Sequence, residues 1–215
     1  METMTFQLHV PSSVCIIGPS LSGKTYLVSE MIKRRNEVFE KNLKKVLYVY
    51  GHYQSLFDQL KASESDIRFT SSIEELENPV KVPTLIVLDD MMLEASKKGR
   101  LNDIITRYFL ARVHHEQYVF VLILQNGFEK HLRNVALNTQ YLGIFNNPRD
   151  KSIAYTFGRQ IIPSNPRFIV EAYERAVSLR PYGFLWLDLH PQSSNSKFWC
   201  RSDLFPTEDC EIYVP

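Results

Sequence analysis

Short runs of apolar, largely β-branched or aromatic residues recur along the chain between polar stretches. Six of them are SVCII, KVLYVY, IRFT, TLIVLD, YVFVLIL and QYLGIF, at residues 13–17, 45–50, 67–70, 84–89, 118–124 and 140–145. Several lack the alternation of a half-exposed strand, so we expect strands that are buried on both faces. Stretches with helical spacing lie between them, near 24–38, 53–62, 72–77 and 98–115. This order predicts an α/β fold with a mostly parallel sheet and helices on both faces.

The last part of the chain has a different pattern. The segments YGFLWLDLHP (182–191) and KFWCRSDLF (197–205) predict two strands around the polar turn QSSNS. Before them, Asn165 and Pro166 have the residue types of a helix N-cap and first turn. A two-stranded unit is too small to fold alone.

We therefore expect one domain over residues 1–215, with a core at 1–163 and a C-terminal helix and hairpin extension at 164–215. The aromatic residues of this extension are expected in the core of the hairpin rather than on a base-stacking platform. They are Tyr182, Phe184, Trp186, Phe198 and Trp199.

Composition limits the classes of protein that fit. Hydrophobic residues make up 44% and charged residues 23% of the 215 residues, as in globular proteins. The net charge of +1 provides no overall basic field, so any nucleic-acid contact must come from a local patch or a ring of subunits. The three cysteines suggest reduced thiols and an intracellular setting. Neither a signal peptide nor an apolar run of membrane-spanning length is present, so we expect no membrane span.

The segment GPSLSGKT directly follows the first apolar run and opens the first helical stretch. A glycine, four free positions and then Gly-Lys-Thr is the spacing of a phosphate-binding P-loop. Gly18 and Gly23 allow successive backbone N–H groups to point at phosphate oxygens, and the helix N-terminus adds a partial positive charge. The predicted nucleotide-binding residues are Gly18, Pro19, Ser20, Leu21, Ser22, Gly23, Lys24 and Thr25.

The P-loop and a nearby pair of acids predict which side chains contact the phosphates and the metal. Lys24 would reach the β- and γ-phosphates of ATP, and the Thr25 hydroxyl would ligate Mg²⁺. Asp89, at the end of the apolar run TLIVLD, would hold the Mg²⁺ through water. Asp90 would be the base or water-orienting residue of hydrolysis, although glutamate is the usual residue in that role. A solvated pair of acids at a strand end is the alternative interpretation of these two residues.

A third polar position closes another apolar run. Gln125 follows YVFVLIL and would lie beside the γ-phosphate, where an amide can sense the nucleotide or place the attacking water. The alternative is an amide that caps the turn QNG.

With a P-loop, a double-Asp strand end and a strand-terminal Gln, the chain resembles the FtsK–HerA class of P-loop motors. More narrowly, it is similar to the viral DNA-packaging ATPases of poxviruses, Polinton/Maverick elements and adintoviruses. Beyond the two Walker motifs, the resemblance is carried by ALNTQYLGIFNNPRDKSIAYTFGRQIIP (136–163) and by the tail segments YGFLWLDLHP and CRSDLFP (200–206). It thus covers nearly the whole chain.

The resemblance implies a RecA-like sheet and a ring of subunits, commonly a hexamer. It implies ATP-driven translocation of double-stranded DNA into a viral capsid, with a capsid or portal protein as partner. The protein would then act in the host cell, at a nuclear or cytoplasmic assembly site, or be associated with the virion.

The resemblance also implies an arginine finger that reaches into a neighbouring subunit's site from a strand end after Gln125. Arg149, in NNPRD, is the favoured residue, and Arg133 and Arg159 are rivals. A surface ion pair of Arg149 with Asp150 is the alternative. Polinton-type relatives typically carry a lysine where this chain has Asn146, so one positive charge is missing beside the proposed finger.

DNA contact would fall to loops that face the pore of the ring, since no winged helix or similar module is present. Lys97, Lys98 and Arg100 form a basic cluster that we expect in a loop after the metal-side acids. Such a loop could contact phosphates without reading bases. A solvated loop before a helix is the alternative interpretation.

Two other classes of function share the nucleotide motifs. The first is an AAA+-type replication ATPase or helicase, which would need a helical lid after its core, where this chain has strand-like segments. An inactive, nucleotide-dependent structural subunit is considered together with it. A small-molecule kinase would carry an arginine-rich lid, and the chain has no comparable cluster.

Overall fold

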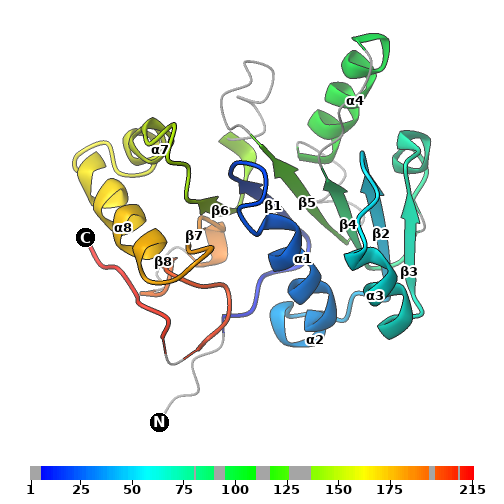
Figure 1. Cartoon of the computed structure of the whole chain (residues 1–215), viewed down its shortest axis with the longest axis horizontal. Coiled ribbons are helices and arrows are strands. Elements are labelled where there is room, and N and C mark those ends of the chain that lie inside the picture. The colour runs from blue at the N-terminus through cyan, green and yellow to red at the C-terminus, as the bar shows by residue number, and fades with distance from the viewer. Residues whose placement is uncertain are drawn as a thin grey trace.

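A continuous β-sheet runs through the protein (Figure 1). The computed structural model describes residues 6–79, 81–89, 95–109, 117–125, 137–193, 197–207 and 209–215, the side chains of 95–98 excepted. Within these ranges eight strands pair in the order β3-β2-β4-β5-β1-β6-β7-β8. They are β1 (Ser12–Ile17), β2 (Lys45–Tyr50), β3 (Ile67–Thr70), β4 (Thr84–Asp89), β5 (Tyr118–Leu124), β6 (Tyr141–Phe145), β7 (Phe184–Asp188) and β8 (Cys200–Arg201).

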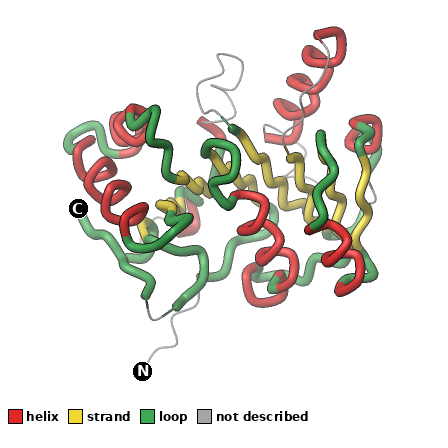
Figure 2. The backbone as a smooth tube through the Cα atoms, in the orientation of Figure 1, coloured by secondary structure: helices red, strands yellow, loops and turns green. Residues whose placement is uncertain are grey.

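Helices flank this sheet (Figure 2). Those that the structure describes, with two short 3₁₀ turns, are α1 (Lys24–Lys33), α2 (Arg35–Val38), α3 (Leu56–Ser63), η1 (Ile73–Leu76), α4 (Ala95–Arg107), α7 (Ser152–Ile161), α8 (Pro166–Ser178) and η4 (Pro191–Ser193). Not one of these helices is long and apolar enough to cross a membrane.

The central strand β1 shows why both faces are covered. Val14 and Ile16 point to one face and pack in a cluster that includes side chains of α1 and α3. Cys15 and Ile17 point to the other face, into a cluster with α7 and α8. Farther along that second face, α4 covers β2, β4 and β5 with Leu101 and other apolar side chains. The unbroken apolar runs thus follow from helices on both sides of the sheet, as predicted.

Strand direction separates the core from the C-terminal extension. Neighbouring strands from β3 to β6 are parallel, whereas β7 is antiparallel to both β6 and β8. The prediction of two strands in the tail is confirmed, with a second strand of only two residues. Asn165 is the residue before α8 and Pro166 its first residue, as predicted, but the Asn165 side chain makes no capping hydrogen bond.

Two helical segments differ from the sequence prediction. Residues 24–38 form two helices rather than one, because the backbone of Arg34 departs from helical geometry between α1 and α2. Residues 152–161 form α7, which the sequence pattern did not predict.

The expectation of a basic loop at residues 97–100 is wrong. These residues lie in α4, and apolar side chains at Leu101, Ile104 and Ile105 bury one side of that helix. Arg100 is paired with Glu77 at 2.9 Å and with Glu74 at 3.4 Å. Its guanidinium is therefore engaged within the chain.

A buried cation ties the extension to the start of the chain. The Arg201 side chain is buried; its Nε donates to the Asp203 carbonyl at 2.9 Å and its Nη1 to that of Phe198 at 2.7 Å. The guanidinium lies over the Phe6 ring, 4.5 Å from its centroid. Burial lowers the pKa of Arg201 to about 10, which leaves it charged at neutral pH. Backbone carbonyls and an aromatic face thus offset part of the loss of water, while Nη2 is buried without a hydrogen-bond partner among the described residues.

Candidate functional site

The turn between β1 and α1 carries the predicted P-loop. Its first residue, Gly18, is hydrogen-bonded to the end of β5, where the Gly18 N–H donates to the Leu124 carbonyl at 3.1 Å. A Cβ on Gly18 would lie 2.6 Å from Cβ of Phe145, closer than atoms can pack. Gly23 is the N-cap of α1 and has φ 100°, a left-handed conformation that favours glycine. Both motif glycines therefore have a structural reason.

Lys24 folds back onto this turn. Its Nζ donates to the carbonyls of Gly18 and Pro19, both at 2.7 Å, and the residue is only 7% exposed. A buried ammonium is stable only when its hydrogens are paired. Phosphate oxygens offer stronger, charge-assisted acceptors than carbonyls. The ammonium is thus already placed at the loop where the motif would hold a phosphate.

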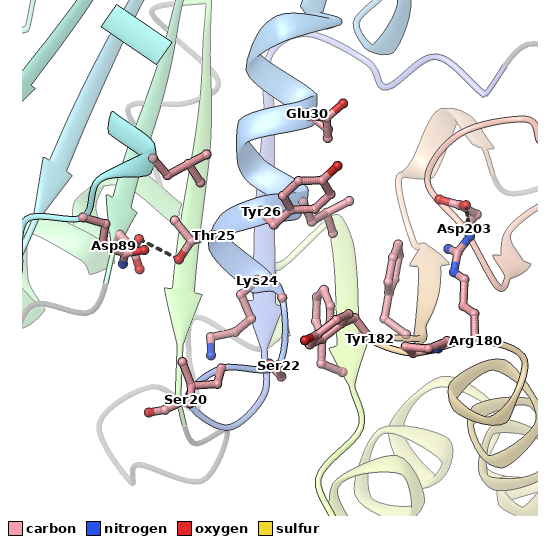
Figure 3. Close-up of a pocket in the computed structure, with 18 of the residues that line it drawn as sticks. Ser20, Ser22, Lys24, Thr25, Tyr26, Glu30, Asp89, Arg180, Tyr182 and Asp203 are labelled. Atoms are coloured by element: carbon pink, nitrogen blue, oxygen red, sulfur yellow. Dashed lines mark hydrogen bonds and ion pairs between the residues drawn. The ribbon is translucent and has the colours of Figure 1, made fainter. Parts of the chain in front are cut away.

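Asp89 lies at the carboxyl end of β4 and is 4% exposed. The Thr25 hydroxyl donates to its Oδ2 at 3.1 Å (Figure 3), so the two predicted metal-side residues are in contact. A hydroxyl and a carboxylate side by side are the hard oxygen donors that Mg²⁺ prefers. The part of the chain that the structure describes holds no cluster of three or more His, Cys, Asp or Glu for a metal.

Tyr48 is a site residue that the sequence did not reveal. From the neighbouring strand β2, its hydroxyl donates to the same Oδ2 of Asp89 at 2.7 Å. Burial, and then the Asp89 charge, hold the Tyr48 pKa well above its usual range, so it remains a hydrogen-bond donor. The sequence shows an apolar strand with a tyrosine in it, and only the pairing of β2 with β4 brings that tyrosine to the acid.

We expect Tyr48→Phe to keep the fold and to weaken the magnesium site. Loss of a donor that orients Asp89 should lower the Mg²⁺ affinity of the nucleotide complex about tenfold, the usual scale for groups that orient a metal ligand. A Mg²⁺ titration of ATP turnover measures this. Tyr50→Phe, on the same strand, is the control. An unchanged Mg²⁺ dependence in Tyr48→Phe would show that this hydrogen bond does not orient Asp89.

Gln125 follows β5, the strand between β1 and β4 in the sheet. Ile17 pairs with Leu124 and Asp89 with Ile123, so the amide emerges between the phosphate loop and the acid. Gln125 lines the same cavity as Lys24 and Asp89. The structure thus brings these predicted residues together.

The other predicted catalytic residues are placed differently. Asp90 and Arg133 lie outside the described residues. Arg149 is exposed in the turn between β6 and α7, and its N–H donates to Asn147 Oδ1 at 3.1 Å. Within the described part of the chain its guanidinium makes no hydrogen bond or ion pair, so the proposed pairing with Asp150 is absent. Arg159 is exposed in the last turn of α7.

The β6–α7 turn is close to the phosphate loop. Asn147 and Asp150 line a small void of about 10 Å³ together with Gly18 and Gln125. The Asn147 N–H donates to the buried Tyr173 hydroxyl at 3.0 Å, which holds the turn against α8. The segment that carries Arg149 is therefore fixed beside the site.

A cavity of about 1030 Å³ extends from Asp89 across the phosphate loop to the C-terminal extension (Figure 3). This volume is at the upper end of the range found for small-molecule binding sites. The far wall comes from the extension and includes Arg180, Pro181, Tyr182, Phe184, Asp203 and Phe205. Phe184 and Trp186 are buried in the core as predicted, but Tyr182 is 68% exposed and lines the cavity. The expectation that Tyr182 belongs to the hairpin core is wrong.

No family model matches this sequence, and no curated protein sequence matches it. The fold, however, is similar to those of solved structures. The genome packaging NTPase B204 of Sulfolobus turreted icosahedral virus 2, with ATP-gammaS, superposes with a TM-score of 0.54 at 15% identity, over 95% of this chain and 98% of that one. The DNA-packaging ATPase B204 of Sulfolobus turreted icosahedral virus has the same score and coverage at 16% identity.

A part of a longer protein is also similar. The cytoplasmic domain of the type VII secretion ATPase EccC of Thermomonospora curvata has a TM-score of 0.55 at 12% identity, over 82% of this chain and 24% of that one. The chain has a P-loop NTPase fold. The P-loop, Asp89 and Gln125 all lie at the carboxyl ends of the neighbouring strands β1, β4 and β5. This fold thus gives the predicted site its geometry. The likeness to B204 extends over nearly the whole of both chains and so includes most of the extension.

Proposed function

We propose that this protein is a Mg²⁺-dependent ATPase of the FtsK–HerA class that moves double-stranded DNA into a viral capsid. The observation that carries the proposal is the meeting of Lys24, Thr25, Asp89 and Gln125 at one cavity, from three separate segments of the chain. The full-length likeness to two genome-packaging proteins supports the finer assignment.

Each of these side chains has a proposed task in ATP hydrolysis. The Lys24 ammonium exchanges a loop carbonyl for phosphate oxygens and offsets their charge. Thr25 and Asp89 would hold Mg²⁺, which when bound neutralises charge on the β- and γ-phosphates. Gln125 orients the water that attacks the γ-phosphorus, while the bond to the ADP oxygen breaks. Asp90, next to Asp89 in the sequence, is the proposed acceptor of the water's proton.

The alternative of an AAA+-type ATPase fits the structure less well. Such a protein would continue from its core into a helical lid. Here the chain returns after α8 to the same sheet as β7, which pairs with β6 over five residues. The extension therefore continues the sheet of the core, unlike a helical lid that would cover the site.

We further propose that subunits assemble into a ring, commonly a hexamer in this class, and that Arg149 acts on a neighbour's nucleotide. The guanidinium is exposed, and its turn is braced beside the site by Tyr173. A cation presented between subunits would offset charge that grows on the γ-phosphoryl oxygens in the transition state.

Arg149→Ala is expected to bind ATP normally and to lose turnover about 1000-fold. Mixing it with Lys24→Ala subunits should restore part of the activity, because an intact Arg149 from one variant then faces an intact site of the other. Phosphate release in the mixture measures this, with Arg159→Ala as the matched control. No recovery on mixing would contradict an arginine that acts between subunits.

ATPase activity with and without linear double-stranded DNA, followed together with particle mass, tests the proposed function. The motor predicts ring-sized particles whose turnover rises when duplex DNA is added. ATP turnover that does not change when DNA is added, by particles with the mass of one chain, would contradict the proposed function.

A further inference from the structure

The cavity is longer than its phosphate-binding part. Figure 3 shows Asp89 and Thr25 on one side of Lys24, and Tyr182, Arg180 and Asp203 on the other. The acid side is where the metal and the terminal phosphate would lie under the proposed function. A triphosphate that lies along the loop therefore directs its nucleoside toward the wall built by the extension.

Tyr182 has an unusual backbone in this wall. Its φ is 60°, in the left-handed region that a residue with a bulky side chain rarely adopts. Strain of this kind persists where the surrounding structure imposes it, and it often marks a functional position. Here the turn is closed by the Gly183 N–H, which donates to the Arg180 carbonyl at 3.0 Å. The ring stands exposed at the cavity, beside the phosphate loop, since a Cβ on Gly23 would lie 3.2 Å from Cβ of Tyr182.

Contacts behind the ring fix this turn. Arg180 pairs with Asp203 at 2.6 Å, and the side chain of Asp203 is only 6% exposed. A second Arg180 nitrogen donates to the Ser202 carbonyl at 3.2 Å. On the other side of the turn, a Cβ on Gly183 would lie 2.7 Å from the Ala176 carbonyl oxygen of α8. The turn is thus held between α8 and the last segment of the chain.

We propose that the Tyr182 ring is the platform on which the base of the bound nucleoside triphosphate stacks. This inference rests on the proposed function for the position of the phosphates. An exposed, rigidly held aromatic ring at the nucleoside end of the cavity has the chemistry for this task, because every base offers an aromatic face. Stacking alone does not read the edge of the base, so ATP and GTP bind with similar affinity. The Arg180–Asp203 ion pair positions the platform without touching the base.

Calorimetric titration with two ligands, Mg·ATP and Mg·tripolyphosphate, tests the proposal. The wild-type protein should bind ATP more tightly than tripolyphosphate. Tyr182→Asn removes the ring but keeps a residue that tolerates positive φ, so the turn is preserved. It should lower ATP affinity about tenfold and leave tripolyphosphate affinity unchanged. Tyr182→Phe should bind both ligands like the wild type, as should Tyr155→Asn, which removes an exposed tyrosine from α7.

Three results would overturn the platform. One is unchanged ATP affinity in Tyr182→Asn, and another is an equal loss for both ligands, which would mean that Tyr182 supports the phosphate loop instead. The third is a wild-type protein that binds tripolyphosphate as tightly as ATP. This result would support a phosphate site but would show that the base adds nothing to the affinity. A wild-type protein that binds neither ligand would contradict the proposed function itself.

Discussion

Lys24→Ala is expected to reduce ATP turnover about 100-fold or more, the scale for loss of one charge-stabilising donor, and to weaken ATP binding. The Lys24 ammonium is the buried cation of the phosphate loop, held by two loop carbonyls at 2.7 Å. Without it, the phosphate oxygens lose the one cation that the phosphate loop itself would place against them, and within the loop they keep the backbone amides and the helix N-terminus. Phosphate release and calorimetric ATP binding measure the two effects.

Lys45→Ala is the matched control for this experiment. Lys45 is an exposed lysine at the first position of β2, at the opposite end of that strand from the site. It should bind and hydrolyse ATP like the wild type. Cooperative thermal unfolding of both variants confirms that each is folded. Full turnover in folded Lys24→Ala would contradict the assignment of the phosphate site.

Asp89→Asn is expected to bind nucleotide and to lose Mg²⁺-dependent turnover about 100-fold. The amide keeps the size of the side chain and an oxygen that can accept from Thr25 and Tyr48, so the local structure should survive. It removes the negative charge that favours the metal. A Mg²⁺ titration of phosphate release, together with ATP binding in its presence, separates the two steps.

The control for this change is Asp103→Asn, an exposed aspartate on α4. It should leave both binding and turnover unchanged. If Asp89→Asn responds to Mg²⁺ like the wild type, Asp89 is a strand-end acid without a metal role.

The strands were predictable because burial on both faces demands unbroken apolar sequence. The predicted strands at 45–50, 67–70, 84–89 and 118–124 have the observed bounds, and those at 13–17 and 140–145 differ by one residue at one end. Helices with unusual composition were harder. In α7, Gly158 interrupts the helical pattern, and the structure shows why a glycine is there: a Cβ would lie 2.4 Å from the Pro166 carbonyl oxygen at the start of α8. Close packing of two helices thus overrides a poor local helix propensity.

At the start of α4 a second helical segment was expected as a loop, although the helical stretch expected near 98–115 overlaps this helix. Its first half carries Lys97, Lys98, Gly99 and Arg100, a composition that is typical of a loop. Apolar residues later in the helix, which pack on the sheet, stabilise it as a helix. The basic composition of these residues therefore suggested a loop where a tertiary contact stabilises a helix.

The site was predictable only as far as it is encoded in short motifs. The P-loop, Asp89 and Gln125 come from strand ends whose residues have characteristic types, and parallel strands bring such ends to one edge. Tyr48 and Tyr182 carry no such signal. Tyr48 reaches Asp89 through the order of the strands, and Tyr182 reaches the loop through the antiparallel return of the extension. Both depend on contacts between distant segments.

The most direct test of the account is a structure of the protein with Mg²⁺ and a non-hydrolysable ATP analogue, in which one distance decides. The account predicts that Lys24 Nζ leaves at least one of the carbonyls of Gly18 and Pro19 and lies about 2.8 Å from a phosphate oxygen. A nucleotide bound elsewhere, with Nζ still on both carbonyls, would contradict it.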